Sequence, residues 1–259
     1  MAFQIIRHAF RMVFGNLREA LKVSVGPYLI LSVIVVLAVG MISETGGMFD
    51  NGTPMGGAEP MQPTAALIIL ALIPVVLFTV AWVAVAWHRF ILLEEYPGLL
   101  PQLAGRPIWA YVGRSILYGF IIALASLPLI FLTMGLAMPL MMAGSGVAAV
   151  FVSVLITGFM TYVWLRIAIA LPSIAIGQPI SMGDSWHATK GMSGTIFGVA
   201  FLLMGINGVA TVLIAEISAV LPLVGFVLDI AVRWTVLMLG VSILTTLYGH
   251  LIEGRDLPI

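Results

Sequence analysis

Six long apolar blocks constrain this chain more than any other feature of its sequence. Each block is almost free of charged residues, and the six cover residues 23–43, 65–88, 109–135, 148–171, 193–217 and 228–250. A helix needs about 20 apolar residues to cross a hydrocarbon layer about 30 Å thick. The blocks therefore predict an all-α integral membrane protein with six transmembrane helices.

Composition and charge narrow the classes of function. Of the 259 residues, 61% are hydrophobic and 8% are charged, whereas soluble domains carry roughly a quarter charged residues. Eleven basic and eleven acidic residues cancel, so no overall field attracts nucleic acid. The absence of cysteine excludes disulfides, thiolate catalysis and thiolate metal sites. We therefore expect membrane lipids or another membrane protein as partners, and not nucleic acid.

The first 22 residues predict an amphipathic helix at the cytoplasmic face. One face carries apolar residues at spacings of three and four, namely Phe3, Ile6, Phe10, Val13, Leu17 and Leu21. Another face carries Arg7, Arg11, Arg18 and Lys22. Such a helix lies in the headgroup layer, where each cation adds about 1 kcal/mol of attraction to anionic lipid. It serves either as an anchor for the first span or as a dedicated lipid or partner site.

The distribution of Lys and Arg predicts the orientation. Basic residues near helix ends are retained on the cytoplasmic side. With the N-terminus inside, ten of the eleven basic residues lie at or near the cytoplasmic face, and Arg233 alone lies on the other side. We expect three parts: the helix over 1–22, a six-helix domain over 23–251 and a cytoplasmic tail over 252–259.

An aromatic and basic pattern recurs about every 80 residues where the even-numbered spans end. It reads Trp87-His88-Arg89, Trp164-Leu165-Arg166 and Tyr248-Gly249-His250. One interpretation is six interface anchors, with rings among the headgroups and cations reaching outward. The other is three repeated helical hairpins. The sequence leaves both open.

The outer ends of the last two spans contain a polar group. Asp229 and Arg233 are four residues apart and can pair along one helix face, and Glu216 ends the preceding span across a short turn. Such a group is either a structural clamp or a contact for a substrate or ion, because ionisable residues in membranes are often functional.

Close helix packing is predicted in the fifth span. Gly194 and Gly198 form a Gly-x-x-x-Gly pattern, which allows a neighbouring helix to approach closely. Asn207 lies in the middle of the same span and is expected to hydrogen-bond to an adjacent helix.

Catalytic and metal-binding patterns are weak throughout. The four histidines are scattered, and the sequence has no His-Glu-x-x-His arrangement. Asp184, Ser185 and His187 include the residue types of a hydrolase triad, but no nucleophile elbow surrounds Ser185. Ser181 or Asp184 is instead expected to cap a short interfacial helix. We expect no enzyme activity, no cofactor and no metal.

Several motifs resemble a broad bacterial group of membrane proteins. They are the basic amphipathic start, Tyr162-Val-Trp-Leu-Arg166 through Leu171-Pro172-Ser-Ile-Ala-Ile-Gly177, the Ser185-Trp186 to Thr189-Lys190-Gly191 connector, and Thr246-Leu-Tyr248. The group comprises YciC-like six-span inner-membrane proteins and the membrane domain of some glycerophosphodiester phosphodiesterases. The resemblance implies a helical bundle in a bacterial inner membrane. The resemblance does not imply phosphodiesterase activity, because the sequence has no phosphodiesterase domain.

Two functions follow as expectations. The first is a non-catalytic scaffold, assembly or accessory component that binds lipid or a membrane partner. The alternative is a permease for a small or amphipathic solute. A continuous polar cavity reaching the middle of the membrane favours the permease, and an exposed apolar groove favours the accessory role.

Overall fold

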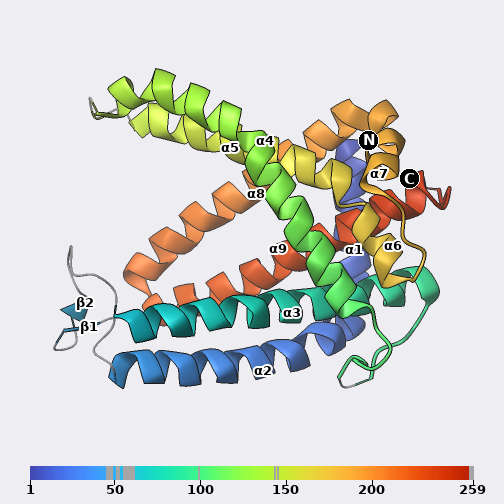
Figure 1. Ribbon diagram of the computed structural model, residues 1–259, viewed down its shortest axis with the longest axis horizontal. Coiled ribbons are helices and arrows are strands. Elements are labelled where there is room, and N and C mark those ends of the chain that lie inside the picture. Colours follow the sequence, from blue (N-terminus) through green and yellow to red (C-terminus); the bar gives the residue numbers. More distant parts are fainter. Residues whose placement is uncertain are drawn as a thin grey trace.

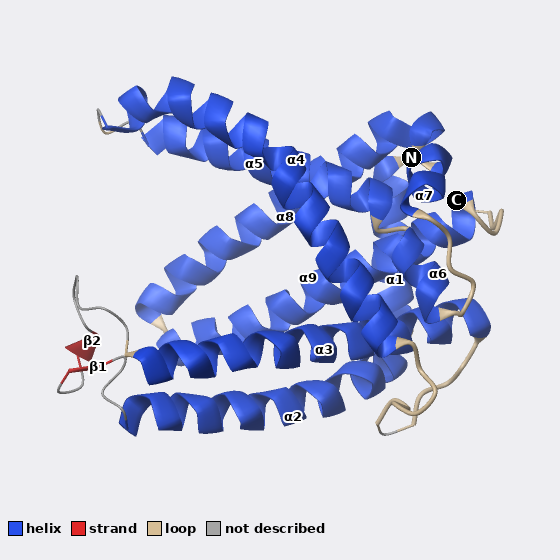
Figure 2. Ribbon diagram, in the orientation of Figure 1, coloured by secondary structure: helices blue, strands red, loops and turns tan. Residues whose placement is uncertain are grey.

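The structure is a computed structural model, and it describes residues 1–44, 49–50, 53–54, 62–98, 100–142, 144 and 146–256. Almost all of these residues are helical (Figure 2). Six helices are long and apolar enough to cross a membrane, so the six predicted transmembrane helices are confirmed. The predicted loop over 44–63 lies mostly outside the described residues.

The elements follow one another in a simple order. The six long helices are α2 (Leu17–Glu44), α3 (Pro63–Leu93), α4 (Ile108–Met142), α5 (Gly146–Ile167), α8 (Ser193–Val220) and α9 (Pro222–Leu251). The shorter helices are α1 (Ala2–Gly15), α6 (Ala170–Ala175), α7 (Met182–Ala188) and a 3-10 turn, η1 (Lys190–Met192). Two short antiparallel strands, β1 (Phe49–Asp50) and β2 (Thr53–Pro54), pair between α2 and α3.

The long helices pack as three consecutive hairpins, α2 with α3, α4 with α5, and α8 with α9. Both termini lie at one end of the molecule, together with α1, α6 and α7 (Figure 1). We call this the terminal end. The hairpin turns lie at the opposite end, the tip end, where the three hairpins diverge. The packed hairpins agree with either interpretation of the aromatic and basic pattern, so the internal repeat stays a prediction.

The buried core lies towards the terminal end. The buried residues of α3 lie mainly in its last four turns, those of α9 mainly between Met238 and Gly249, and those of α8 between Ile196 and Ala200. Residues nearer the tips, such as Leu136 and Val212, are exposed. Lipid tails are as apolar as these side chains, so no hydrophobic force draws the outer halves together.

Two helix boundaries differ from those expected. The predicted helix over 1–22 ends at Gly15, because Asn16 leaves the helical conformation and its side chain donates to the Met12 carbonyl at 2.8 Å. Arg18 and Lys22 therefore belong to α2. The fourth span ends at Ile167 rather than 171, and α6 follows separately. Pro172 has no N–H to bond the Ala168 carbonyl, so it cannot continue the helix of α5.

Candidate functional site

An apolar pocket of about 460 Å³ lies near the middles of α3 and α9. We call it the membrane pocket. It is lined by α3 (Leu77, Val80, Ala81, Ala84), α4 (Tyr111, Val112, Ser115, Ile116, Gly119), α5 (Trp164), α6 (Leu171) and α9 (Val236, Leu237, Gly240, Val241, Leu244). Ligand pockets typically enclose about 300–1,000 Å³ and combine apolar walls with a few polar groups. The membrane pocket has these properties.

Two glycines keep the pocket open. A Cβ atom added at Gly119 or at Gly240 would meet no atom within 4 Å. Both positions face the pocket, from α4 and from α9 respectively. Any larger side chain at either glycine therefore occupies volume that the pocket now offers.

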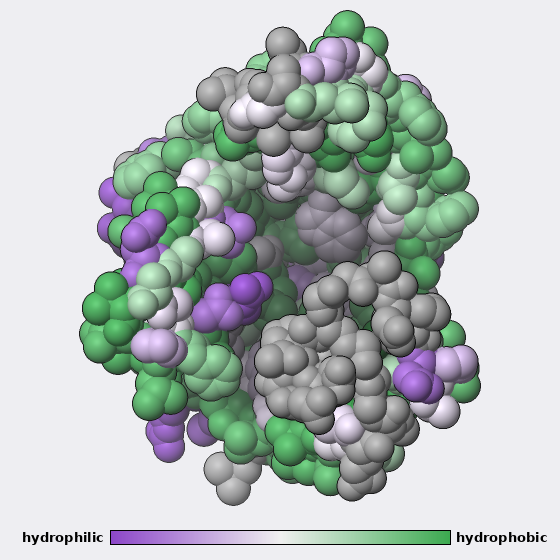
Figure 3. Space-filling model, turned by 90° about the vertical axis from the view of Figure 1, so that its left-hand side faces the viewer, coloured by the Kyte–Doolittle hydropathy of each residue, from purple (hydrophilic) through white to green (hydrophobic). Residues whose placement is uncertain are grey.

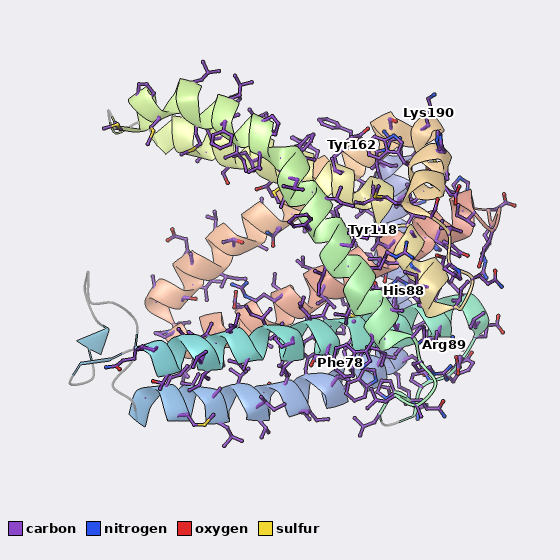
Figure 4. The ribbon with its side chains drawn as sticks, in the orientation of Figure 1. Phe78, His88, Arg89, Tyr118, Tyr162 and Lys190 are labelled. Carbon is purple, nitrogen blue, oxygen red and sulfur yellow. The ribbon has the colours of Figure 1, made fainter. Side chains whose placement is uncertain are left out.

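A buried polar network lies beside the pocket at the terminal end. His88 is fully buried, with Nδ1 at 2.8 Å from the Thr245 hydroxyl and Nε2 at 3.2 Å from the Tyr111 hydroxyl. Thr245 donates its one hydroxyl proton to the Val241 carbonyl, so it accepts from Nδ1–H. Nε2 then accepts from Tyr111. His88 is therefore neutral and fully bonded, and it joins α3, α4 and α9. Figure 4 shows it near the terminal end, with Tyr118 farther along α4.

The polar group predicted near the outer ends is only partly assembled. Asp229 and Arg233 pair at 2.6 Å, and the Arg233 side chain is 77% exposed. Glu216 is also exposed, and it forms no ion pair within the described part of the chain. Glu216 lies on α8, whereas Asp229 and Arg233 lie on α9, and the described structure has no ion pair between Glu216 and Arg233, so a three-residue cluster does not form.

A charged cluster lies in the connection between α3 and α4. Arg89 donates to Glu95 at 2.6 Å, Arg106 also pairs with Glu95, and Arg89 donates to the Ala175 carbonyl at 2.8 Å. Partial burial opposes ionisation of Glu95, but the hydrogen bonds from Arg89 and Arg106 hold its pKa below the ordinary value. A second pocket of about 260 Å³ lies beside this cluster. The charged cluster fastens the connection between α3 and α4 to the end of α3.

Arg166 joins two of the segments that resemble YciC-like proteins, Tyr162–Arg166 and Ser185–Gly191. Its guanidinium donates to the Thr189 hydroxyl, the Tyr162 hydroxyl and the Trp186 carbonyl, each at 3.0 Å, and stacks 3.8 Å from the Trp186 ring. Only 6% of Arg166 is exposed. A planar guanidinium suits this combination of stacking and hydrogen bonding. The residue therefore fastens α7 to α5 instead of reaching into the headgroups.

The cap predicted for α7 is present. Ser181 accepts from the backbone N–H of Asp184 at 3.0 Å, and the Asp184 carboxylate accepts from the backbone N–H of Ser181 at 3.0 Å. The hydrogen bonds from Ser181 lower the pKa of Asp184. Ser185 donates to the Arg166 carbonyl at 2.7 Å, away from His187. These contacts give Asp184 and Ser185 structural roles.

The other predicted anchors also contact protein. Trp87 is fully buried and donates to Ser242 at 2.9 Å, Tyr248 is 2% exposed, and Trp164 lines the membrane pocket. His250 donates to the Arg255 carbonyl at 2.9 Å. The two rings of Trp87 and Tyr248 thus lie inside the bundle, because their neighbouring helices close over them.

The small-residue surface of α8 packs on α1. A Cβ atom added at Gly198 would lie 3.0 Å from the Cβ atom of Ala2, whereas one at Gly194 would meet nothing within 4 Å. Asn207 is exposed, and its side chain forms no hydrogen bond among the described residues. The expected bond from Asn207 to an adjacent helix is therefore absent from the described structure.

The basic residues of the N-terminal segment divide between two helices. Arg7 and Arg11 lie on α1, and Arg18 and Lys22 lie on α2. None of the four pairs with a carboxylate in the part of the chain that the structure describes. Arg11 and Arg18 are exposed, which leaves their charges available to surrounding groups.

Sequence reasoning missed the pocket itself. Its lining comes from five helices, and most of its residues are ordinary apolar ones without a motif. It also missed the pairing of His88 with Thr245, 157 residues away. The one sequence signal that could have indicated the pocket is the presence of Gly119 and Gly240 inside predicted spans.

The fold and the pocket define a multi-pass α-helical membrane protein. No group of three or more metal-ligating side chains occurs among the residues that the structure describes. No family model, no curated protein and no solved structure matches the chain. The resemblance to YciC-like proteins therefore stays a prediction that rests on the motifs.

Proposed function

We propose that the chain is a non-catalytic, multi-pass protein of a bacterial inner membrane that serves as a scaffold, assembly or accessory component. In this proposal the membrane pocket holds a hydrocarbon chain of a membrane lipid. The observation that carries it is the apolar lining of a pocket of about 460 Å³ near the middles of the membrane-spanning helices.

The surroundings of the pocket support a lipid chain over a polar solute. The walls contributed by α3 and α9 are entirely apolar, so they offer nothing to replace the hydration of a polar molecule. Towards the terminal end, the hydroxyls of Tyr111 and Thr245 are already bonded to the imidazole of His88. A hydrocarbon chain requires no such hydrogen bonds.

The permease remains the second candidate. It is supported by the charged pair of Asp229 and Arg233 and by the diverging hairpin tips. It requires a polar solute to pass the His88 network, whose donors and acceptors are matched in this structure. Loss of a solute gradient from vesicles containing the purified protein would favour the permease over the accessory role.

Filling the pocket tests the proposed function. The protein is purified in a mild detergent, and retained lipid is measured by native mass spectrometry. We expect Gly119→Leu and Gly240→Leu to weaken lipid retention about tenfold or more. Each new leucine side chain would fill pocket volume that the hydrocarbon chain of the lipid occupies.

Gly135→Leu is the matched control. Gly135 also lies on α4 with nothing within 4 Å of an added Cβ, but it does not line the membrane pocket. It should retain lipid like the wild type. Equal retention by all three variants, or no retained lipid in the wild type, contradicts the proposal. The same spectra report any stoichiometric protein partner.

A further inference from the structure

The Asp229–Arg233 pair lies on the face of α9 that leads into the membrane pocket. Arg233 precedes the lining residues Val236, Leu237 and Gly240 by three, four and seven positions. Residues at these spacings share one helix face. Arg233 is thus about one turn beyond the pocket on the tip side, and Asp229 is about one turn farther out.

The pair lies at an unusual depth for exposed charge. Arg233 is about three turns inside α9, which begins at Pro222. Its side chain is 77% exposed and that of Asp229 is 36% exposed, although they contact each other at 2.6 Å. Charges at this depth normally face a polar partner or water. The pair therefore has unused hydrogen-bonding capacity at a place where hydrocarbon cannot satisfy it.

The tip end of the molecule is hollowed. Figure 3 looks into the tip end and shows a hollow between the diverging hairpins, bordered by both hydrophobic and hydrophilic residues. Along α9, the charged pair lies on the tip side of the membrane pocket, so a ligand that occupies both would place its polar part towards the tip side of its apolar part.

We propose that the membrane pocket and the Asp229–Arg233 pair together form a site for one phospholipid whose headgroup carries both a phosphate and a primary ammonium. The inference rests on the proposed function, and it specifies the class of lipid. The acyl chain occupies the pocket, the phosphate accepts hydrogen bonds from Arg233, and the ammonium donates to Asp229.

The order of the groups carries this assignment. From the pocket outward, the protein presents apolar walls, then a cation, then an anion. Such a lipid presents a hydrocarbon chain, then a phosphate, then an ammonium. An anionic headgroup would satisfy Arg233 but place no positive charge beside Asp229. Bidentate hydrogen bonds from a guanidinium to a phosphate also suit Arg233.

Lipid competition tests the assignment. The purified protein is exchanged into nanodiscs that contain equal amounts of an ethanolamine phospholipid and an anionic glycerol phospholipid with the same chains. The bound lipid is then identified by native mass spectrometry. We expect the wild type to enrich the ethanolamine lipid about tenfold over the anionic one, the ratio given by one charge-assisted hydrogen bond.

Two variants separate charge from folding. Asp229→Asn should abolish the preference while lipid is still retained, and the double variant D229R/R233D, which keeps a pair but reverses its order, should abolish it too. Arg233 is exposed and Asp229 is partly exposed, so the helix tolerates these changes. Glu216→Gln, an exposed acid on α8 outside the pocket lining, should keep the wild-type preference.

The outcomes distinguish the two proposals. Retained lipid without an ethanolamine preference in the wild type, or an unchanged preference in Asp229→Asn, overturns the headgroup assignment and leaves the proposed function standing. No retained lipid in the wild type overturns both. A choline lipid has no N–H to donate to Asp229, so equal retention of choline and ethanolamine lipids also contradicts the assignment.

Discussion

At the residue scale, the charged side chains near the terminal end mainly fasten local structure. Arg166 bonds α7 to α5, and the Arg89–Glu95–Arg106 cluster ties the connection after α3 back to that helix. Neither arrangement contains the free nucleophile and oriented base that catalysis requires. The residues of the aromatic and basic pattern thus have packing partners that interface preferences alone do not predict.

The Glu95 cluster predicts a dependence on pH. The pKa of Glu95 is below its ordinary value of 4.5, so its stabilising contribution is complete above about pH 4.5 and is lost as the pH falls through the lowered folded value. Glu95 is partly exposed, so the contribution is about 1 kcal/mol or less. Hydrogen exchange of residues 94–107, corrected for intrinsic rates, should show protection falling up to about fivefold on acidification.

Adjacent glutamates provide the control for this measurement. Glu95→Gln should give low protection at every pH, because the neutral amide cannot form the two ion pairs. Glu94→Gln should behave like the wild type, since Glu94 has no ion pair within the described part of the chain. A wild-type pH profile in Glu95→Gln would show that the cluster does not hold the connection.

At the element scale, α1 is part of the bundle. Its buried face consists of Ile5, Ile6, Ala9 and Val13, and it packs on α8 and α9. Phe3, which the sequence predicts on the apolar face, is 67% exposed. An amphipathic pattern indicates which residues avoid water, but it is the same whether the apolar face meets lipid or protein. Here it meets protein.

The packing of α1 predicts an asymmetry between two apolar substitutions. Ile5 is fully buried, so Ile5→Ala should lower the free energy of unfolding by about 2–5 kcal/mol. Phe3→Ala, at an exposed position of the same helix, should change it by about 0.5 kcal/mol or less. Denaturant unfolding in detergent measures both. Equal effects of the two substitutions would be incompatible with docking through Ile5.

At the scale of the whole molecule, the three hairpins are joined at one end and separate at the other. Packing is extensive where α1, α6 and α7 close the terminal end. Towards the tips, the exposed apolar surfaces are matched by the hydrocarbon of the bilayer, which costs nothing in hydrophobic free energy. The exposed surface towards the tips is therefore compatible with helices that span a membrane.

The direction of the molecule in the membrane is predicted by its basic residues. A reagent that cannot cross the membrane should label a cysteine placed at Asn51, in the predicted outer loop, and should fail to label one placed at Gln178 in intact cells. Gln178 is exposed at the terminal end, so permeabilised cells should label it too. The chain contains no native cysteine to interfere. The reverse labelling pattern contradicts cytoplasmic termini.

Local features of the fold could be predicted from the sequence. The six spans depend on the length of apolar runs, the α7 cap depends on Ser181 and Asp184 three residues apart, and the Asp229–Arg233 pair depends on helical spacing. Each is determined by residues close together in the chain. The end of α5 was missed because residues 168–171 are all apolar and continue the run beyond Ile167.

Tertiary structure alone decided which residues meet across the bundle. Trp234 donates to Ser24 across 210 residues, and Trp87 donates to Ser242 across 155. A transmembrane helix is apolar all round, so its hydropathy does not reveal which face is turned inward. The sequence therefore determined how many times the chain crosses the membrane, and the packing of the helices decided which residues line the membrane pocket. Span formation is a local matter of length and hydropathy, whereas the pocket depends on shape complementarity between distant helices.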